Sequence, residues 1–402
     1  MGNSGAFRTR VCALLVSLTG LGFLACQETD IAELDSSAAA KGGNSADTRL
    51  VSEGRDIFRL DDFGDWRFWT DSLRLNDLVE TVTPNQALAL GLKVDVDAIP
   101  PATLQAVMAN PALLDDPATT LLLLSVNAVL GIKATVQGDQ ITRFGITCGL
   151  CHSNVDNESG IGHRMDGWAN GDLAVGTIVS LAPGLPDALR PEYAKWPPGF
   201  YDPRFNFDGI NDPVVIPPAY GLHGVGRETY TGEGPISYWN QYVAVTQMHG
   251  RGSFVDNKLG ISIVVPPSED LVKSKLPALR AYQHSLEAPA PPPGSFNSAA
   301  AARGAVVFET VGGCARCHSG PNYTNGRLHA PAETGMDPVH AQRSTTKLYR
   351  ATPLRGLWQH APYFHDGSAP TLAAVVEHYN SFLGLNLTAA QKADLVEFLK
   401  SL

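Results

Sequence analysis

The chain has 402 residues, of which 40 are acidic and 30 are basic, so its formal net charge at neutral pH is −10. Its 44% hydrophobic and 17% charged residues are typical of a globular protein, and the length is sufficient for two domains. Proteins that bind nucleic acid carry basic patches, and the acidic balance of this chain argues against such a partner.

The first 26 residues have the features of an export signal. Arg8 and Arg10 provide a basic start, and the run from Val11 to Ala25 is uncharged, apolar and too short to span a bilayer as a helix. The run ends at Phe23 to Cys26 (F-L-A-C), which resembles the lipobox of bacterial lipoproteins, where the cysteine is lipidated. Ordinary cleavage without a lipid is the alternative, although Phe23 is large for that type of site.

We therefore expect residues 1–26 to be a signal peptide and the polar residues 27–48 to be a tether. No aspartate directly follows Cys26. By resemblance to sorting in bacterial lipoproteins, this implies the outer membrane. This predicts a protein on the periplasmic side of the cell envelope, bound to the membrane through an N-terminal lipid anchor alone. A second apolar run, Leu121 to Ile132, is also shorter than a membrane span and predicts a buried helix.

Four of the six cysteines form two C-x-x-C pairs, and each pair is followed directly by a histidine. Cys148 to His152 reads C-G-L-C-H, and Cys314 to His318 reads C-A-R-C-H. In a c-type haem site the two thiols form thioethers with the haem vinyl groups and the adjacent imidazole binds the iron. The pattern predicts two covalently bound haem c groups, attached through Cys148, Cys151, Cys314 and Cys317, with His152 and His318 as iron ligands.

A zinc site and a redox-active dithiol are the alternatives for these pairs. Paired zinc-ribbon knuckles usually lie about 15–20 residues apart, whereas a much longer stretch of chain separates Cys151 from Cys314. A thioredoxin-like dithiol needs a βαβ context and gives no reason for the histidine after each pair. Haem attachment is the interpretation that explains both repeats.

Residues 288–294 (A-P-A-P-P-P-G) form a stiff linker, because proline fixes φ and removes a hydrogen-bond donor. We predict an N-terminal haem c domain over residues 49–287 and a C-terminal cytochrome c domain over residues 295–402. In the second domain an alanine-rich helix from Ser298 to Glu309 precedes the attachment motif, and Thr388 with Gln391 forms a capping box for a last helix.

The predicted fold class is mainly α, with two cytochrome-c-like haem domains and extensive loops. The glycine- and proline-rich segment from Pro183 to Gly234 predicts coil rather than sheet. Near the C-terminus, residues 370–383 predict a helix, because Leu372, Val376 and Tyr379 recur at helical spacing on one face.

Three segments of the C-terminal third resemble the bacterial di-haem cytochrome c peroxidase superfamily, which includes the MauG-type enzymes. They are Thr352 to Leu357 (T-P-L-R-G-L), Ala361 to Gly367 (A-P-Y-F-H-D-G) and Val375 to Tyr379 (V-V-E-H-Y). The segment from Leu276 to Gly320 also resembles the approach to the second haem in that superfamily. The resemblance implies an oxidoreductase that takes electrons from a small redox protein or another donor and reduces hydrogen peroxide.

Upstream, the resemblance implies further site residues. Gly162-His163 is similar to the segment that brings a distal histidine onto the first haem, and Trp239 is similar to the tryptophan between the haems. Trp239 can also be one more tryptophan packed in a core. In the family, a glutamine and a glutamate line the peroxide pocket after that tryptophan. Here Gln247 and His249 follow, the glutamate has no counterpart, and His249 is the candidate to move a proton in its place.

The sixth iron ligands are left open by the sequence. For the first haem, His163 is preferred over Met165, and a hydrogen-bonded loop histidine is the alternative. For the second haem, resemblance to MauG-type enzymes implies Tyr379, while Met336 and His365 are the other choices. The alternative for Tyr379 is a core tyrosine with a hydrogen-bonded hydroxyl.

Together these observations predict an exported di-haem c-type cytochrome that moves electrons from a small donor, by way of the second haem, to the first haem, where hydrogen peroxide is reduced. The alternative is a pure electron-transfer cytochrome with no substrate site. A third possibility within the same superfamily is O₂ chemistry like that of the rubber oxygenases. The difference lies in whether one iron can open a coordination position.

Overall fold

The computed structural model describes residues 45–402, and these residues lie in one compact unit. The predicted signal peptide, the predicted lipidation site at Cys26 and most of the predicted tether lie outside the described residues. The division into two domains at residues 288–294 stays a prediction. Across residues 45–402, no helix has the length and apolar character needed to cross a membrane.

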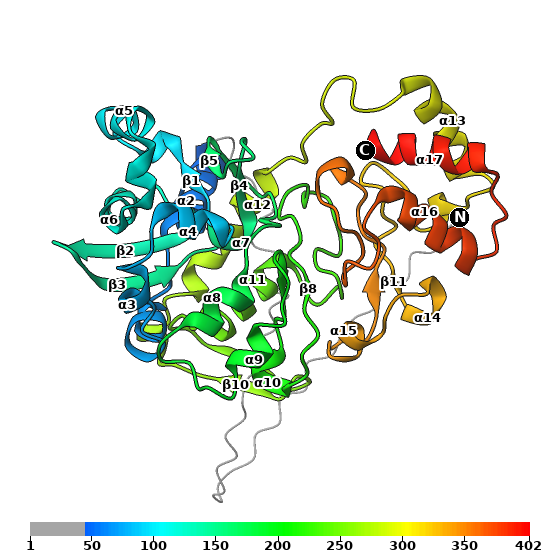
Figure 1. The fold of residues 1–402 in the computed structure, drawn as a ribbon. Helices are drawn as coiled ribbons and strands as arrows, with labels where there is room; N and C mark the ends of the chain where they lie inside the picture. Colours follow the sequence, from blue (N-terminus) through cyan, green and yellow to red (C-terminus); the bar gives the residue numbers. More distant parts are fainter. Residues whose placement is uncertain (1–44) are drawn as a thin grey trace, which may run out of the picture. The chain divides into compact units, whose positions relative to one another are not determined.

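Helices dominate the part of the chain before the proline-rich segment (Figure 1). The longest is α2 (Ser45–Leu60), which packs against α12 (Leu276–Ser285), and α11 (Ile236–Thr246) is the third of ten residues or more. The remaining helices are short: α3 (Leu75–Val79), α4 (Pro84–Ala89), α5 (Pro101–Ala109), α6 (Pro117–Ser125), α7 (Gly149–His152), α8 (Val175–Leu181), α9 (Arg190–Tyr193) and α10 (Phe205–Asp208).

Strands occur within the described residues only as two-stranded pairs, so the prediction of a mainly α fold with little sheet is confirmed. The longest pair is the antiparallel hairpin of β2 (Ile132–Gln137) and β3 (Gln140–Ile146). The other pairs are β1 (Val94–Asp95) with β5 (Ile161–Gly162), β4 (Ser153–Val155) with β6 (Arg164–Asp166), β7 (Phe200–Tyr201) with β8 (Val214–Val215), β9 (Phe254–Asp256) with β10 (Ile261–Ile263), and β11 (Leu328–His329) with β12 (Tyr349–Arg350).

The predicted helix from Leu121 to Ile132 is correct only in its first half. Helix α6 ends at Ser125, and Ile132 already belongs to strand β2. Asn127 and Gly131 have positive φ angles of 54° and 74°. Both residue types tolerate the left-handed region, which ends a helix, so the apolar run divides into a largely buried helix and the buried first residue of a strand.

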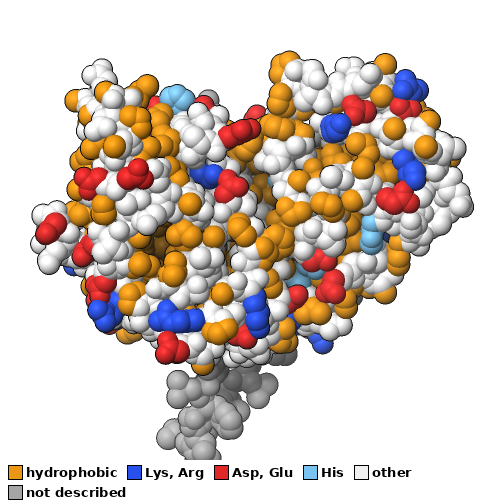
Figure 2. Space-filling view, in the orientation of Figure 1, with side chains coloured by type: hydrophobic (Ala, Val, Ile, Leu, Met, Phe, Trp, Pro, Cys, Tyr) orange, Lys and Arg blue, Asp and Glu red, His pale blue; other side chains and the backbone are white. Residues whose placement is uncertain are grey.

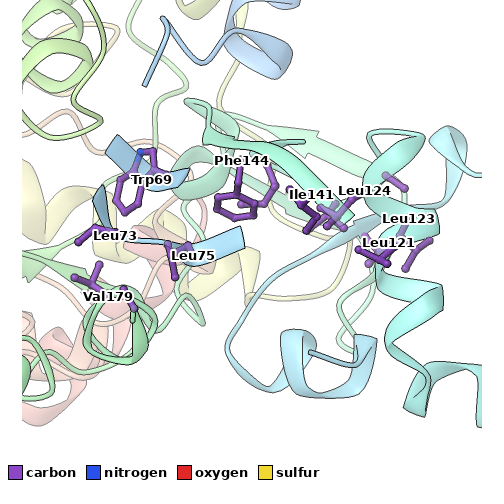
Figure 3. Packing of buried hydrophobic residues seen from close by; sticks show 14 of the residues in the cluster. Trp69, Leu73, Leu75, Leu121, Leu123, Leu124, Ile141, Phe144 and Val179 are labelled. Atoms are coloured by element: carbon purple, nitrogen blue, oxygen red, sulfur yellow. The ribbon is translucent and has the colours of Figure 1, made fainter. Parts of the chain in front are cut away.

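A hydrophobic core lies between α6, the hairpin and the chain that follows α2 (Figure 3). Trp69, Leu75 and Phe144 lie toward one end of this cluster, and Leu121 and Ile141 lie toward the other. Because both strands of the hairpin contribute side chains, the cluster fixes the position of β3. The end of β3 leads directly to Cys148, so this core also positions the first attachment motif.

After the proline-rich segment, α13 (Ser298–Glu309) matches the predicted helix and packs beside α17 (Ala389–Lys400) (Figure 1). A Cβ atom at Gly304 would lie 2.0 Å from the Asp394 carbonyl oxygen, so the glycine permits this close approach. The predicted capping box is confirmed, since Thr388 N donates to Gln391 Oε1 at 2.9 Å. The other helices are α14 (Pro331–Thr334), α15 (Val339–Gln342) and α16 (Leu372–Phe382), the last within the predicted residues 370–383.

Two buried carboxylates join residues 202–233 to residues 343–345. Asp202 accepts hydrogen bonds from both terminal nitrogens of Arg343, at 2.9 and 3.0 Å. Glu233 pairs with Arg204 at 2.5 Å and also accepts the backbone N–H of Thr345 at 2.7 Å. Loss of one partner from a buried pair of this kind typically costs about 3–5 kcal/mol, because the other charge stays buried without a partner.

Asp65 is a buried acid beside the first attachment motif. It is fully buried, and its Oδ2 accepts hydrogen bonds from Trp69 Nε1 at 3.1 Å and from Ile146 N at 3.2 Å. Its Oδ1 has no hydrogen-bond partner among the described residues. Burial, with the nearby Asp62 carboxylate adding to it, raises the pKa of Asp65 to about 9. The folded protein therefore holds Asp65 protonated at neutral pH.

This pKa predicts a fall in stability as the pH rises. Because the folded state binds a proton more tightly than the unfolded state, stability is lost between the unfolded pKa near 4 and the folded pKa of about 9, by up to about 1.4 kcal/mol per pH unit. Asp65→Asn should remove that slope and be the more stable protein at pH 8. Thermal unfolding at pH 5, 6.5 and 8 measures this, with the exposed Asp71→Asn as control. Parallel pH profiles for wild type and Asp65→Asn would contradict the assignment.

Candidate functional site

The first attachment motif forms a single helical turn, α7, at the end of strand β3. The Nδ1–H of His152 donates to the carbonyl oxygen of Pro217 at 3.0 Å. Burial lowers the pKa of His152 to about 4, so the imidazole is neutral. A neutral ring that donates from Nδ1 has its Nε2 lone pair available for a metal, which is the arrangement that an iron ligand requires.

The second motif is arranged in the same way. Cys314 begins a short 3₁₀ turn, and the Nδ1 of His318 lies 3.0 Å from the carbonyl oxygen of Thr352 and 3.2 Å from that of Tyr323. Burial also lowers the pKa of His318. In both motifs the closest accepting carbonyl belongs to a residue that precedes a proline, in Pro217-Pro218 and in Thr352-Pro353.

A cavity of about 320 Å³ adjoins the first motif and is lined by Cys148, Cys151 and His152. Figure 2 shows hydrophobic side chains around a hollow close to β2 and β3. Two thiols and a neutral imidazole on one apolar wall fit a covalently held haem. The hydrophobic wall includes Leu75, Leu78, Val79, Ile132, Phe144, Ile146, Val175, Ile178 and Val179.

Trp239, Gln247 and His249, all predicted from the sequence, line the same cavity. Trp239 lies on α11, and Gln247 directly follows the end of that helix. The amide of Gln247 is fixed, because its Oε1 accepts the hydroxyl of Tyr201 and its Nε2 donates to Thr246 Oγ1 at 2.9 Å. The structure thus brings these three residues together with the first motif.

His249 has an unusual backbone conformation. Its φ angle is 62°, in the left-handed region that residues with a side chain rarely adopt. The ring stacks on Phe68 with centroids 3.6 Å apart, and the residue is exposed where it lines the cavity. Burial by the protein packed around the ring lowers the pKa of His249 to about 4. A neutral imidazole held in a strained position on a cavity wall is a candidate proton acceptor.

The structure does not bring His163 into this set. Its side chain is 65% exposed, and its Nδ1 lies 3.0 Å from both carboxylate oxygens of Asp97. This hydrogen bond raises the pKa of His163. The neighbouring Met165 lies in strand β6 and is also absent from the cavity wall. The role of His163 as a distal ligand stays a prediction from resemblance, without a supporting contact.

Tyr379 lies on α16 close to the second motif. Burial raises the pKa of its hydroxyl to about 12, and the nearby Cys317 and Cys314 add to this effect. The ring packs edge-on against Phe364 at a centroid distance of 5.9 Å. Across residues 45–402 its hydroxyl has no protein hydrogen-bond partner. The ligand role and the alternative, a core tyrosine whose hydroxyl is hydrogen-bonded near a haem propionate, both stay predictions.

The other candidates for the second iron have different surroundings. His365 is buried, and its Nε2 lies 2.9 Å from the hydroxyl of Tyr349, so this nitrogen is already engaged. Met336 is half-buried in the turn after α14. His378, beside Tyr379 on α16, is half-buried and its Nε2 lies 2.9 Å from the carbonyl oxygen of Thr334.

Sequence reasoning missed two polar residues of the cavity, His340 and Arg350. Both are far along the chain from the first motif, and neither lies in a pattern with a local chemical meaning. The ion pair of Arg343 with Asp202 and the hydrogen bond from the backbone N–H of Thr345 to Glu233 hold this later part of the chain near the cavity. Only the tertiary fold reveals that placement.

Comparisons with known proteins give matches to parts of the chain. The family described as "RoxA-like, cytochrome c-like" matches residues 348–380. The methylamine utilization protein MauG of Methylorubrum extorquens is 30% identical in an alignment over 120 residues that covers 25% of this chain and 34% of that protein. The cytochrome-c peroxidase IdrP2 of Denitromonas iodatirespirans is 30% identical in an alignment over 140 residues that covers 25% of this chain and 38% of that protein.

Among solved structures, a MauG-like protein associated with microbial copper homeostasis overlaps 47% of this chain and 73% of its own, at 20% identity and a TM-score of 0.33. An overlap of this size does not define a fold. The chain spans about a third of the length of the curated relatives it matches.

These matches confirm the resemblance to the di-haem cytochrome c peroxidase/MauG superfamily. They also support covalently bound c-type haem as the cofactor that the two C-x-x-C-H motifs predict. The chain is thus similar, over part of its length, to c-type cytochromes and to the peroxidase-like oxidoreductases among the curated relatives.

The number of attached haems is directly testable. The denatured protein should retain two haems per chain in a pyridine haemochrome assay, because thioethers survive denaturation. The double variant Cys314→Ser with Cys317→Ser should retain one. Haem that acid acetone extracts, or one haem with zinc at the other pair, would overturn the prediction.

The role of Tyr379 can be tested by Tyr379→Phe. If the phenolate binds the second iron, its loss should change the ferric spin state and raise the potential of one haem, because a phenolate stabilises the ferric state. Tyr323→Phe is the matched control, since Tyr323 packs in the same region and its backbone contacts His318. If both spectra and both potentials stay at their wild-type values, Tyr379 is packing, and Met336 is the next ligand to test.

Proposed function

We propose that this protein is a periplasm-facing di-haem oxidoreductase that reduces hydrogen peroxide with electrons from a small redox protein or another donor. Electrons enter at the second motif and move to the first. An N-terminal lipid anchor on Cys26 attaches the protein to the outer membrane. The resemblance to named cytochrome-c peroxidases supports the peroxidase class.

The observation that carries the proposal is the cavity at the first motif. It places an apolar wall, a fixed amide and a strained neutral imidazole around Cys148, Cys151 and His152. In a pure electron carrier both irons are six-coordinate. Such a protein has no use for a strained imidazole on a cavity wall. The second motif instead packs on a hydrophobic cluster with Leu357, Tyr363 and Val376.

Haem iron, when bound, supplies the one-electron chemistry that peroxide reduction needs. The chain's own residues supply orientation, a dry environment and proton transfer. Gln247, held by Tyr201 and Thr246, offers an amide fixed in one orientation. His249 is neutral and has no hydrogen-bond partner within residues 45–402, so a ring nitrogen can accept a proton and return it. It takes the place that the missing family glutamate leaves.

Replacement of His249 tests this role. His249→Leu should lower the rate of peroxide turnover by about 10²-fold or more, the usual contribution of general acid–base catalysis, while cyanide still binds the reduced or oxidised protein. His163→Leu is the comparison, because that exposed side chain lies outside the cavity and should leave the rate unchanged. If His163→Leu instead creates a new high-spin species, the ligand role implied by resemblance is correct.

The electron-carrier alternative is decided by spin state. Electron paramagnetic resonance of the oxidised and half-reduced wild-type protein should show a high-spin ferric signal in at least one state. Two low-spin signals in both states would mean that neither iron opens a position, and the protein would then be an electron carrier. A signal that responds to O₂ and not to peroxide would favour oxygen chemistry.

A further inference from the structure

Arg350 is a positive charge set into the cavity wall of the first motif. It lies at the end of β12, where it pairs with Leu328 of β11, and its side chain lines the cavity with His152. One terminal nitrogen donates to the carbonyl oxygen of Arg227 at 2.6 Å. Its Nε is buried and has no hydrogen-bond partner among the described residues.

No carboxylate of residues 45–402 forms an ion pair with Arg350. Two acids, Asp202 and Glu228, line the same cavity, and both are engaged elsewhere. Asp202 pairs with Arg343, while Glu228 Oε1 lies 2.5 Å from His284 Nε2 and its Oε2 accepts the backbone N–H of Ile236 at 2.5 Å. Burial lowers the pKa of Arg350 to about 10, with Tyr230 and Glu228 opposing the shift. Arginines set into a protein are normally paired, and the half-buried Arg350 has no carboxylate in direct contact within residues 45–402.

His340 is a second unpartnered polar group on the same wall. It is 2% exposed, and within the described residues its Nδ1 has no hydrogen-bond partner. Burial lowers its pKa well below the usual value, so the ring is neutral and can donate one hydrogen bond. Tyr230 links the two residues. Its carbonyl oxygen accepts the backbone N–H of Arg350 at 2.9 Å, and its ring centroid lies 6.5 Å from that of His340.

We propose that Arg350, assisted by His340, binds a carboxylate inside the cavity of the first motif. A guanidinium presents parallel N–H donors that match the two oxygens of a carboxylate, and a buried site strengthens that contact. Two sources carry this chemistry: a propionate of the haem attached at Cys148 and Cys151, or the carboxylate of a small molecule that enters the cavity. A propionate can be the ligand only if haem is attached at this motif, but this assignment does not depend on peroxide being the oxidant.

The position of Arg350 links the two motifs. Two residues further along the chain, the carbonyl oxygen of Thr352 accepts the Nδ1–H of His318. One short segment therefore provides the cation at the first motif and the imidazole acceptor at the second. A carboxylate on Arg350 would tie that segment to the cavity.

The test uses the purified di-haem protein and Arg350→Gln, with the exposed Arg355→Gln as matched control because Arg355 binds Asn322 away from the cavity. If a propionate is the ligand, loss of the cation should lower the midpoint potential of the first haem in spectroelectrochemical titration, while the second haem and the control stay at wild-type values. If a small molecule is the ligand, acetate should shift the absorption spectrum of wild type but not of Arg350→Gln, with the potentials unchanged.

A folded Arg350→Gln protein with two haems, wild-type potentials and a wild-type acetate response would overturn the proposal. If Arg350→Gln does not retain both haems, Arg350→Lys replaces it. Lysine keeps the charge at pH 7 but loses it near pH 10, so the first-haem potential should match wild type at pH 7 and fall below it as the pH rises. A potential that follows wild type over that whole range, together with an acetate response that also stays at wild type at pH 10, would equally reject the carboxylate site. Neither readout depends on peroxide turnover.

Discussion

The buried pairs of Arg343 with Asp202 and of Arg204 with Glu233 are the contacts on which the arrangement of the site depends. Arg343 pairs with Asp202 across the two segments, and Glu233, which pairs with Arg204, accepts the backbone N–H of Thr345. These contacts join the segment before α11 to the segment that leads to β12. They help to keep His340 and Arg350 at a cavity that residues nearly two hundred positions earlier also line. Ion pairs of this kind contribute little net stability, but they specify one arrangement because each alternative leaves a charge unpaired.

The two motifs orient their histidines by the same hydrogen bond, but the residues around them differ. Each imidazole is neutral and donates from Nδ1 to a backbone carbonyl, so each is prepared for iron in the same way. The first motif faces an apolar cavity with His249 on its wall, while the second packs on a hydrophobic cluster near Tyr379. The two motifs therefore differ in the protein groups around them and not in the attachment chemistry.

Local patterns predicted what local chemistry determines. The two C-x-x-C-H motifs, the helix at Ser298 to Glu309 and the capping box at Thr388 are each encoded within a few residues, and the structure has them as expected. The prediction of one helix from Leu121 to Ile132 was wrong in its second half, because hydrophobicity alone cannot distinguish a helix from a strand. Arg350 could not be found at all, since its meaning depends on which distant residues surround it.

The accepting carbonyls of Pro217 and Thr352 each precede a proline, and a residue in that position is restricted to extended backbone. A backbone acceptor cannot be deleted by changing a side chain, so mutational drift at either position leaves the hydrogen bond available. The identity of the acceptor is thereby protected, and only its placement can vary. Evolution of the two iron potentials would then proceed through loop length and through the cavity walls, while the bond that orients each imidazole persists.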